Sequence, residues 1–219
     1  MKKLLLATAL MAGMGVANYN TAEAKSFDGL YLGLQGGYQN GSVDGTLDLT
    51  PLALGTGSRD VDVDGLELGG FAGFRRQLDN NIVLGVELGG LFSNADGSIR
   101  DTFAVGDSIT VDKNGEMYIS FKPGYAVKDN ALLYGIVGYQ RANFDLSYSD
   151  GTNTTSSDDD FDGFHFGFGG EYAKSERISF RAEYKYNDYN DKSYTTTGIG
   201  TETYEGDEST FRLGAVFKF

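Results

Sequence analysis

The sequence predicts an all-β fold, an eight-stranded antiparallel up-and-down transmembrane β-barrel. Three observations predict it: apolar side chains fall on every second position in eight segments, short polar connections alternate with long ones, and the last strand ends on Phe219. Strands of this length, with one apolar and one polar face, are typical of barrels that cross an outer membrane. The apolar face of such a barrel contacts lipid, and the polar face lines its interior.

Residues 1–24 are expected to be a signal peptide and not part of the fold. Residues 2–3 are lysines, 4–16 are mostly apolar, and 22–24 read Ala-Glu-Ala, a small-residue cleavage site. The barrel domain is then 25–219. No later segment has the roughly 18 to 20 consecutive apolar residues of a spanning helix, so we expect export without a helical anchor.

Each of the eight segments is predicted to be a strand because its apolar residues alternate with small or polar ones. In chain order the segments are 30–35, 66–75, 82–89, 117–125, 132–143, 164–172, 178–187 and 210–219. The fifth is apolar at most positions, and we assign Leu133, Val137 and Tyr139 to its lipid face. Pro123 lacks the N–H that a ladder needs, which predicts a local bulge in the fourth.

The connections between these strands alternate in length. Three are tight polar turns, at 78–81, 128–131 and 174–177, and four are predicted to be long polar loops, at about 40–64, 93–115, 145–162 and 189–208. Short periplasmic turns and longer extracellular loops are the usual pattern of an up-and-down membrane barrel. With an even number of strands, both termini are expected in the periplasm.

The two faces of the predicted strands differ in charge. The lipid-facing set contains no charged residue, which agrees with the cost of about 2 to 4 kcal/mol for Lys or Arg facing the middle of the bilayer. Because eight strands enclose a space only wide enough for side chains, we expect the inward charges to pair and plug the barrel. This predicted interior network is Glu67, Arg75, Glu87, Lys122, Glu171, Arg181, Glu183, Lys185 and Arg212.

The composition excludes several classes of protein. The formal net charge is −13, which argues against binding nucleic acid, because neutralising phosphates needs clustered Lys and Arg. The sequence contains no Cys, so neither a disulfide framework nor a thiolate metal site is expected.

With its signal peptide, eight alternating strands and final Phe217-Lys218-Phe219, the chain resembles the outer-membrane β-barrel superfamily that includes the OmpA transmembrane domain and the OmpX, Ail and Opa-type surface proteins. Its mature opening, residues 27–33, is similar to the first strand of small "porin family" barrels. This resemblance implies that Phe217 and Phe219 form the signal read by the barrel-assembly machinery and periplasmic chaperones. It also implies outer-membrane lipid and lipopolysaccharide as partners.

Two acidic tracts match the start of a calcium-binding loop, in which aspartates at alternate positions precede a glycine. The bidentate Glu expected eleven residues after the first Asp is absent, because Phe71 and Gly169 stand there. Solvated strand tips are therefore the favoured interpretation, and weak binding of calcium or magnesium is the alternative. The aspartates are Asp60, Asp62, Asp64, Asp158, Asp160 and Asp162.

His165 is the single histidine of the chain and is predicted to point inward, beside Glu171 or an arginine of the seventh strand. It could act as a general base, as in the lipid A-modifying enzymes of similar architecture. A hydrogen-bonded interior histidine is the commoner outcome, and no His-x-Ser match is present. We therefore expect no enzyme and no required cofactor.

The function expected from these observations is a structural and interactive, adhesin-like surface protein that presents four acidic extracellular loops to host or other extracellular ligands. Loops of this kind carry function while a rigid scaffold positions them. A narrow porin-like channel is the first alternative, because inward Lys and Arg could line an ion path. A lipid A-modifying enzyme is the second.

If the terminal aromatic residue is an assembly signal, replacing Phe219 by Ala, or adding one Lys after it, should impair insertion far more than changes within the long connections do. The measurement is the fraction of protein that shows heat-modifiable gel migration in isolated outer membranes. Normal insertion of both variants would show that Phe219 is simply the end of a strand.

Overall fold

The computed structural model describes residues 26–48, 55–100, 108–149, 152–196 and 200–219. The expected signal peptide and the tips of the four long connections lie outside these ranges. Among the residues described, no helix is long and apolar enough to cross a bilayer.

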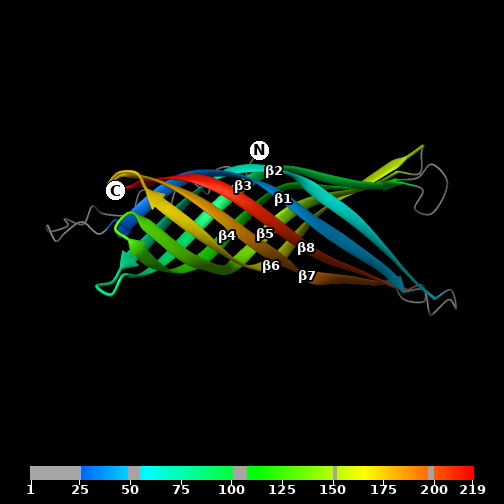
Figure 1. Cartoon of the computed structure of the whole chain (residues 1–219). Coiled ribbons are helices and arrows are strands. Elements are labelled where there is room, and N and C mark those ends of the chain that lie inside the picture. Colours follow the sequence, from blue (N-terminus) through cyan, green and yellow to red (C-terminus); the bar gives the residue numbers. More distant parts are fainter. Residues whose placement is uncertain (1–25, 49–54, 101–107, 150–151, 197–199) are drawn as a thin grey trace, which may run out of the picture.

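Eight strands form one closed barrel in which each strand pairs antiparallel with its neighbours in sequence and β8 pairs with β1 (Figure 1). The predicted fold class is therefore confirmed. The strands are β1 Gly29–Asp48, β2 Thr56–Gln77, β3 Ile82–Arg100, β4 Ser108–Lys128, β5 Ala131–Ser149, β6 Thr154–Ala173, β7 Ile178–Thr196 and β8 Gly200–Lys218.

The tight turns lie together at one end of the barrel, which we call the turn end. Asn81 takes a left-handed conformation, with φ of 64°, which asparagine tolerates better than most residues, and its N–H donates to the carbonyl of Leu78. Both ends of the barrel domain meet here, because the N–H of Phe219 donates to the carbonyl of Leu30 at 3.1 Å. We call the opposite end the loop end.

An apolar belt surrounds the half of the barrel next to the turn end. Its outward side chains include Leu34, Phe92 and Met117, which are 65%, 74% and 73% exposed. The predicted lipid face of the fifth strand is confirmed, since Leu133, Val137 and Tyr139 are all exposed. No Asp, Glu, Lys or Arg points outward within residues 30–38, 66–74, 82–92, 117–125, 133–139, 164–172, 178–186 and 211–217.

The four predicted long loops are largely wrong, because the strands continue through most of them. Each strand has 19 to 22 residues, about twice the length of the apolar belt. In β2, the tract 60–64 alternates exposed aspartates with buried Val61 and Val63, so the period of a strand persists while the outward face changes from apolar to acidic.

The closed ladder opens on two sides toward the loop end. The last β2–β3 pair is Asp64↔Asp96 and the last β6–β7 pair is Gly163↔Tyr189, although all four strands continue. Beyond these pairs, β7, β8, β1 and β2 form one sheet and β3, β4, β5 and β6 form another, and the two groups diverge in Figure 1. We call these the first and second outer sheets.

A cluster of apolar side chains fills the space between the two outer sheets. Val61 and Val63 come from the first sheet, and Val111 and Phe144 come from the second. The loop end is therefore built as a β-sandwich, with its apolar faces inside and its polar faces outside.

The bulge predicted at Pro123 is absent. Pro123 pairs with Leu84 of β3 in the same register as the residues on either side, and register shifts occur elsewhere in β4, between Lys113 and Gly115 and between Ala126 and Lys128. On the β5 side the ladder lacks pairs at Lys122 and Pro123 but keeps its register. The missing N–H of Pro123 therefore removes ladder pairs with β5 locally but does not shift the register of the strand.

Five aspartates form a continuous row across β2 to β6, on the outward face and just beyond the apolar belt. Each stands directly opposite the next, in the order Asp64, Asp96, Asp112, Asp145 and Asp158. Burial raises the pKa of Asp112, and the charges of Asp96 and Asp145 raise it further. Like charges directly opposite one another destabilise a sheet.

Relieving this repulsion should stabilise the protein. A carboxyl group with a raised pKa binds its proton more tightly in the folded state, so its contribution to stability increases as the pH falls through that pKa. Asp112→Asn should therefore raise the free energy of unfolding at pH 7 by about 0.5 kcal/mol, the scale of one cross-strand pair, and the gain should shrink as the pH falls.

The measurement is the free energy of unfolding, from urea titrations in detergent at pH 7 and at lower pH. Asp129→Asn in a tight turn is the control. An equal response of the two variants at pH 7 would contradict the prediction.

Candidate functional site

The nine charged side chains predicted for the interior all lie inside the barrel, and each is at most 7% exposed. They form three levels between the turn end and the loop end, described below in that order. Their residues are Glu67, Arg75, Glu87, Lys122, Glu171, Arg181, Glu183, Lys185 and Arg212.

The level nearest the turn end is built on Arg75 and Glu171. Two guanidinium nitrogens of Arg75 donate to the two carboxylate oxygens of Glu171, at 2.7 and 2.9 Å. The guanidinium carbon also lies 4.8 Å from the ring centroid of Tyr31. A bidentate pair of this kind fixes the direction as well as the distance of both side chains.

The middle level is centred on Glu87, which is fully buried. It accepts hydrogen bonds from Arg181 at 2.6 and 3.0 Å, from Lys122 at 2.7 Å, and from two tyrosine hydroxyls. Glu183 accepts from Lys122 and from Tyr134, both at 2.7 Å. Arg181 also lies 3.3 Å from Glu183. Glu87 and Glu183 therefore share both Lys122 and Arg181 as partners.

The level nearest the loop end is larger than predicted. Arg212 pairs with Glu67 and, at 2.6 Å, with Glu116. The Lys113 ammonium donates to Glu116 at 3.0 Å and to Glu208 at 2.7 Å. Lys185 lies 3.6 Å from Glu116 and closes this group.

The sequence reasoning missed Lys113, Glu116 and Glu208, because it placed the first and the last in loops. Extending the alternation outward would have found Glu116 and Glu208, which continue the inward positions of their strands. It would not have found Lys113, because the register shift before Gly115 reverses the facing of the residues that precede it.

Ion pairs cross the interior from opposite walls at each level. In a ring of eight strands, β2 faces β6, β3 faces β7 and β4 faces β8. Arg75–Glu171 joins β2 to β6, and Arg181–Glu87 joins β7 to β3. Lys113–Glu208 joins β4 to β8. These side chains therefore bridge the lumen instead of lining it.

His165 points inward as predicted but has different neighbours from those expected. Its Nε2 lies 2.8 Å from the Ser120 hydroxyl on β4, and its Nδ1 has no hydrogen-bond partner. Glu171 is engaged by Arg75 instead. A Ser–His pair with no carboxylate on the imidazole, both residues at most 1% exposed, lacks the orienting acid and the access that acyl transfer needs.

The six aspartates of the calcium-like motifs lie on strands, on the outward faces of β2 and β6. Alternate residues of a strand stand about 6.6 to 6.8 Å apart along one face, so the three carboxylates of one motif do not converge on a single ion position. Arg141 engages two of them, Asp160 at 2.7 Å and Asp162 at 3.8 Å. Within the described residues there is no group of three or more His, Asp or Glu side chains arranged to hold a metal ion.

Asp60 has an acidic neighbour as well. It stands opposite Asp44 of β1, and the hydrogen bond between their carboxyl groups raises the pKa of Asp44, with smaller contributions from burial and nearby acids. The outward face of the first outer sheet is therefore strongly acidic.

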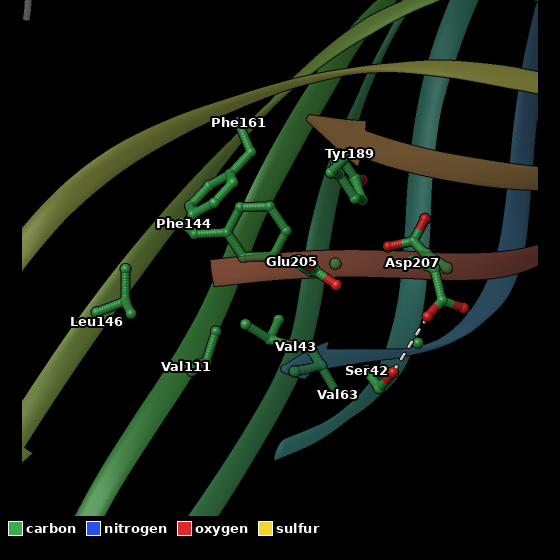
Figure 2. A pocket seen from close by; sticks show the side chains of 13 residues that line it. Ser42, Val43, Val63, Val111, Phe144, Leu146, Phe161, Tyr189, Glu205 and Asp207 are labelled. Carbon is green, nitrogen blue, oxygen red and sulfur yellow. Dashed lines mark hydrogen bonds between the residues drawn. The ribbon is translucent and has the colours of Figure 1, made fainter. Parts of the chain in front are cut away.

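A pocket lies between the two outer sheets (Figure 2). Its cavity has a volume of about 30 Å³ and is partly open to solvent. Val43 and Val63 line it from the first sheet, with Phe144 and Phe161 from the second. Tyr189 of β7 lines it as well, with its ring 5.8 Å from that of Phe144 in an edge-to-face arrangement.

An apolar belt, a closed ladder and a charged interior together define a small transmembrane barrel. Residues 6–219 match the model of the family described as the outer membrane protein beta-barrel domain, and the chain belongs to that family. It is thus a protein of the bacterial outer membrane.

Similar proteins agree with this assignment. The 31 kDa outer-membrane immunogenic protein of Brucella melitensis biotype 1 is 28% identical over 203 residues, which cover 89% of this chain and 84% of that protein. Among solved structures, Pseudomonas aeruginosa OprG matches with a TM-score of 0.54 and 16% identity, over 88% of this chain and 96% of that one. The Escherichia coli outer membrane protease OmpT matches with a TM-score of 0.57 and 10% sequence identity, over 88% of this chain and 97% of that one. These two structures show likeness of fold alone.

The middle level should be decisive for stability. Glu87→Leu would leave Arg181 and Lys122 with Glu183 as their remaining carboxylate partner, and breaking a buried ion pair costs about 3 to 5 kcal/mol. We expect a matching loss in the free energy of unfolding, measured by urea titration of the folded band on gels. Arg141→Ala, which removes an exposed ion pair, is the control and should change little. A loss for Glu87→Leu no larger than for the control would refute this role.

Proposed function

We propose that this protein is a closed outer-membrane barrel that acts through its loop end, as a structural and adhesin-like surface protein without enzymatic activity. The observation that carries the proposal is the set of ion pairs that join opposite walls at three levels. A conducting barrel needs charged side chains around an open path. Here they are paired across it.

The loop end supplies the interactive part of this proposal. We place the loop end outside the cell and both termini in the periplasm, because membrane barrels of this kind usually have short periplasmic turns and longer extracellular connections. The two outer sheets present Asp60, Asp62 and the row from Asp64 to Asp158 to the outside. Such a surface favours cationic patches on host or other extracellular ligands, and attraction of this kind weakens with salt.

Other partners follow from the same geometry. The apolar belt would contact outer-membrane lipid. We expect the outward aspartates, which begin just beyond this belt, to meet lipopolysaccharide phosphates through calcium or magnesium. The exposed Phe219 would be read by the barrel-assembly machinery and periplasmic chaperones during insertion. The barrel itself would then be a scaffold.

Two measurements test this function. Purified protein in planar bilayers should give no unitary conductance steps, with a general porin as the positive control. Reproducible steps at each insertion would replace the scaffold by a pore.

In nanodiscs, the protein should bind immobilised extracellular-matrix proteins. That binding should fall about tenfold or more in a variant with Asn at 96, 145 and 158, since steering by charge changes association rates by 10-fold or more. Binding that is absent, or indifferent to these substitutions and to salt, would contradict the adhesin-like role.

A further inference from the structure

The three residues before β1 lie at the mouth of the barrel at the turn end, and we call residues 26–28 the cap. Phe27 is fully buried, although β1 and its ladder begin only at Gly29. It shares one apolar cluster with side chains of β3, β4, β5 and β6, and β5 stands opposite β1 in the ring. The Phe27 side chain therefore points across the mouth and not along the wall. The other members of the cluster are Val83, Ala126, Leu132, Tyr134, Ile136 and Ala173.

Side chains of β2 and β8, the two neighbours of β1, hold the cap in place. The N–H of Phe27 donates to the side-chain oxygen of Gln77 at 3.2 Å. The Lys218 ammonium donates to the carbonyl of Ser26 at 2.8 Å. The Asp28 carboxylate accepts from the N–H of Gln77 at 3.4 Å. Polar groups of the cap backbone are thus paired beyond the end of the ladder, as buried backbone groups require.

Two cations face the ring of Phe27. The guanidinium carbon of Arg75 lies 5.2 Å from the ring centroid, and the Lys218 nitrogen lies 5.8 Å from it. An aromatic face attracts a cation more strongly where water is excluded. Because Arg75 is also the partner of Glu171, Phe27 packs directly on the ion pair nearest the turn end.

A small cavity lies between this ion pair and the middle level of the network. Its volume is about 20 Å³, and its lining includes Arg75 and Glu171 from one level and Lys122 and Arg181 from the other. Val83, which belongs to the same cluster as Phe27, lines it as well. Water and salt that reach an ion pair weaken it by screening, so these pairs gain from a cover over the mouth.

We propose that the cap is a seal, in which the Phe27 side chain closes the turn end of the barrel against water and water-soluble molecules. The seal is separate from the ion pairs, because it acts before a solute reaches the first of them. It goes beyond the surface role proposed above, since it concerns the opposite end of the barrel and does not depend on what the loop end binds.

Thiol accessibility tests the seal, because the chain contains no Cys and a single introduced one gives an unambiguous signal. Val83→Cys places a thiol behind the cap, and Val111→Cys places one in the apolar cluster of the loop end. The measurement is the rate at which an anionic, water-soluble methanethiosulfonate modifies each folded protein in nanodiscs, followed by mass spectrometry.

Phe27→Ala should raise the modification rate of Val83→Cys about tenfold or more, which corresponds to a fall of about 1.4 kcal/mol in the free energy of local opening. It should leave the rate of Val111→Cys unchanged. Phe27→Leu retains a large apolar side chain and should keep the thiol at position 83 slow to react. Lys218→Ala removes the donor to Ser26 and should raise the rate at position 83 by a smaller factor.

Phe144→Ala is the matched control, because it removes a buried phenylalanine from the cluster of the loop end. It should speed modification of Val111→Cys and leave Val83→Cys slow. Heat-modifiable migration verifies that each variant is folded. An unchanged rate for Val83→Cys with Phe27→Ala, or equal acceleration at both ends, would overturn the seal. Binding to matrix proteins tests the surface role separately, because the cap lies at the other end of the barrel.

Discussion

Closure of the hydrogen-bond ladder is the constraint on which the rest of the structure depends. In the hydrocarbon core, no water satisfies a free backbone N–H or C=O, so the strands must pair all the way around, and β8 must return to β1. Eight strands close into a narrow ring, which leaves no room for a hydrated charge inside. The interior charges are therefore stable only as pairs, and every level of the network follows from that requirement.

The two openings in the ladder occur where this constraint ends. Within the apolar belt, the β2–β3 and β6–β7 ladders are continuous, and both stop just beyond it, at Asp64↔Asp96 and Gly163↔Tyr189. Beyond that height the outward side chains are acidic, so the unpaired strand edges face water, which can satisfy them. The wall can then separate into two sheets at no cost in buried polar groups.

How much of this could be predicted from the sequence depends on the distance over which each determinant acts. Alternation is local, so it correctly placed the lipid face of every strand and all nine interior charges. It failed at the outer ends because aspartate and glycine are typical of loops, while the alternating Val61 and Val63 that identify a strand are sparse. Lys113 could not be placed, because a register shift is a property of two strands and not of one.

The partners within the network were likewise beyond the sequence. Alternation says that Arg75 and Glu171 both point inward, but which of them meet depends on the tilt and stagger of the whole ring. The same holds for Ser120 and His165, which are 45 positions apart and become neighbours only through the register of β4, β5 and β6. Inward direction is a one-strand property, whereas pairing is a property of the closed barrel.

The inward-facing side chains change from polar to apolar along the barrel axis, because the surroundings of the barrel change from lipid to water. Where the barrel is surrounded by lipid, its apolar side chains point outward and its polar side chains point inward. Where it is surrounded by water, valine and aromatic side chains point inward, because this removes their surface from water. The Lys113–Glu208 pair lies at this boundary, and Glu208 also lines the pocket between the outer sheets. This pair separates a polar plug, in which ion pairs join opposite walls, from an apolar cluster between two sheets that share no ladder pair beyond Asp64↔Asp96 and Gly163↔Tyr189. Beyond the last β6–β7 ladder pair, the Lys192–Asp159 ion pair at 2.6 Å still joins β7 to β6, so the two outer sheets stay connected across that seam while the closed ladder lies below them.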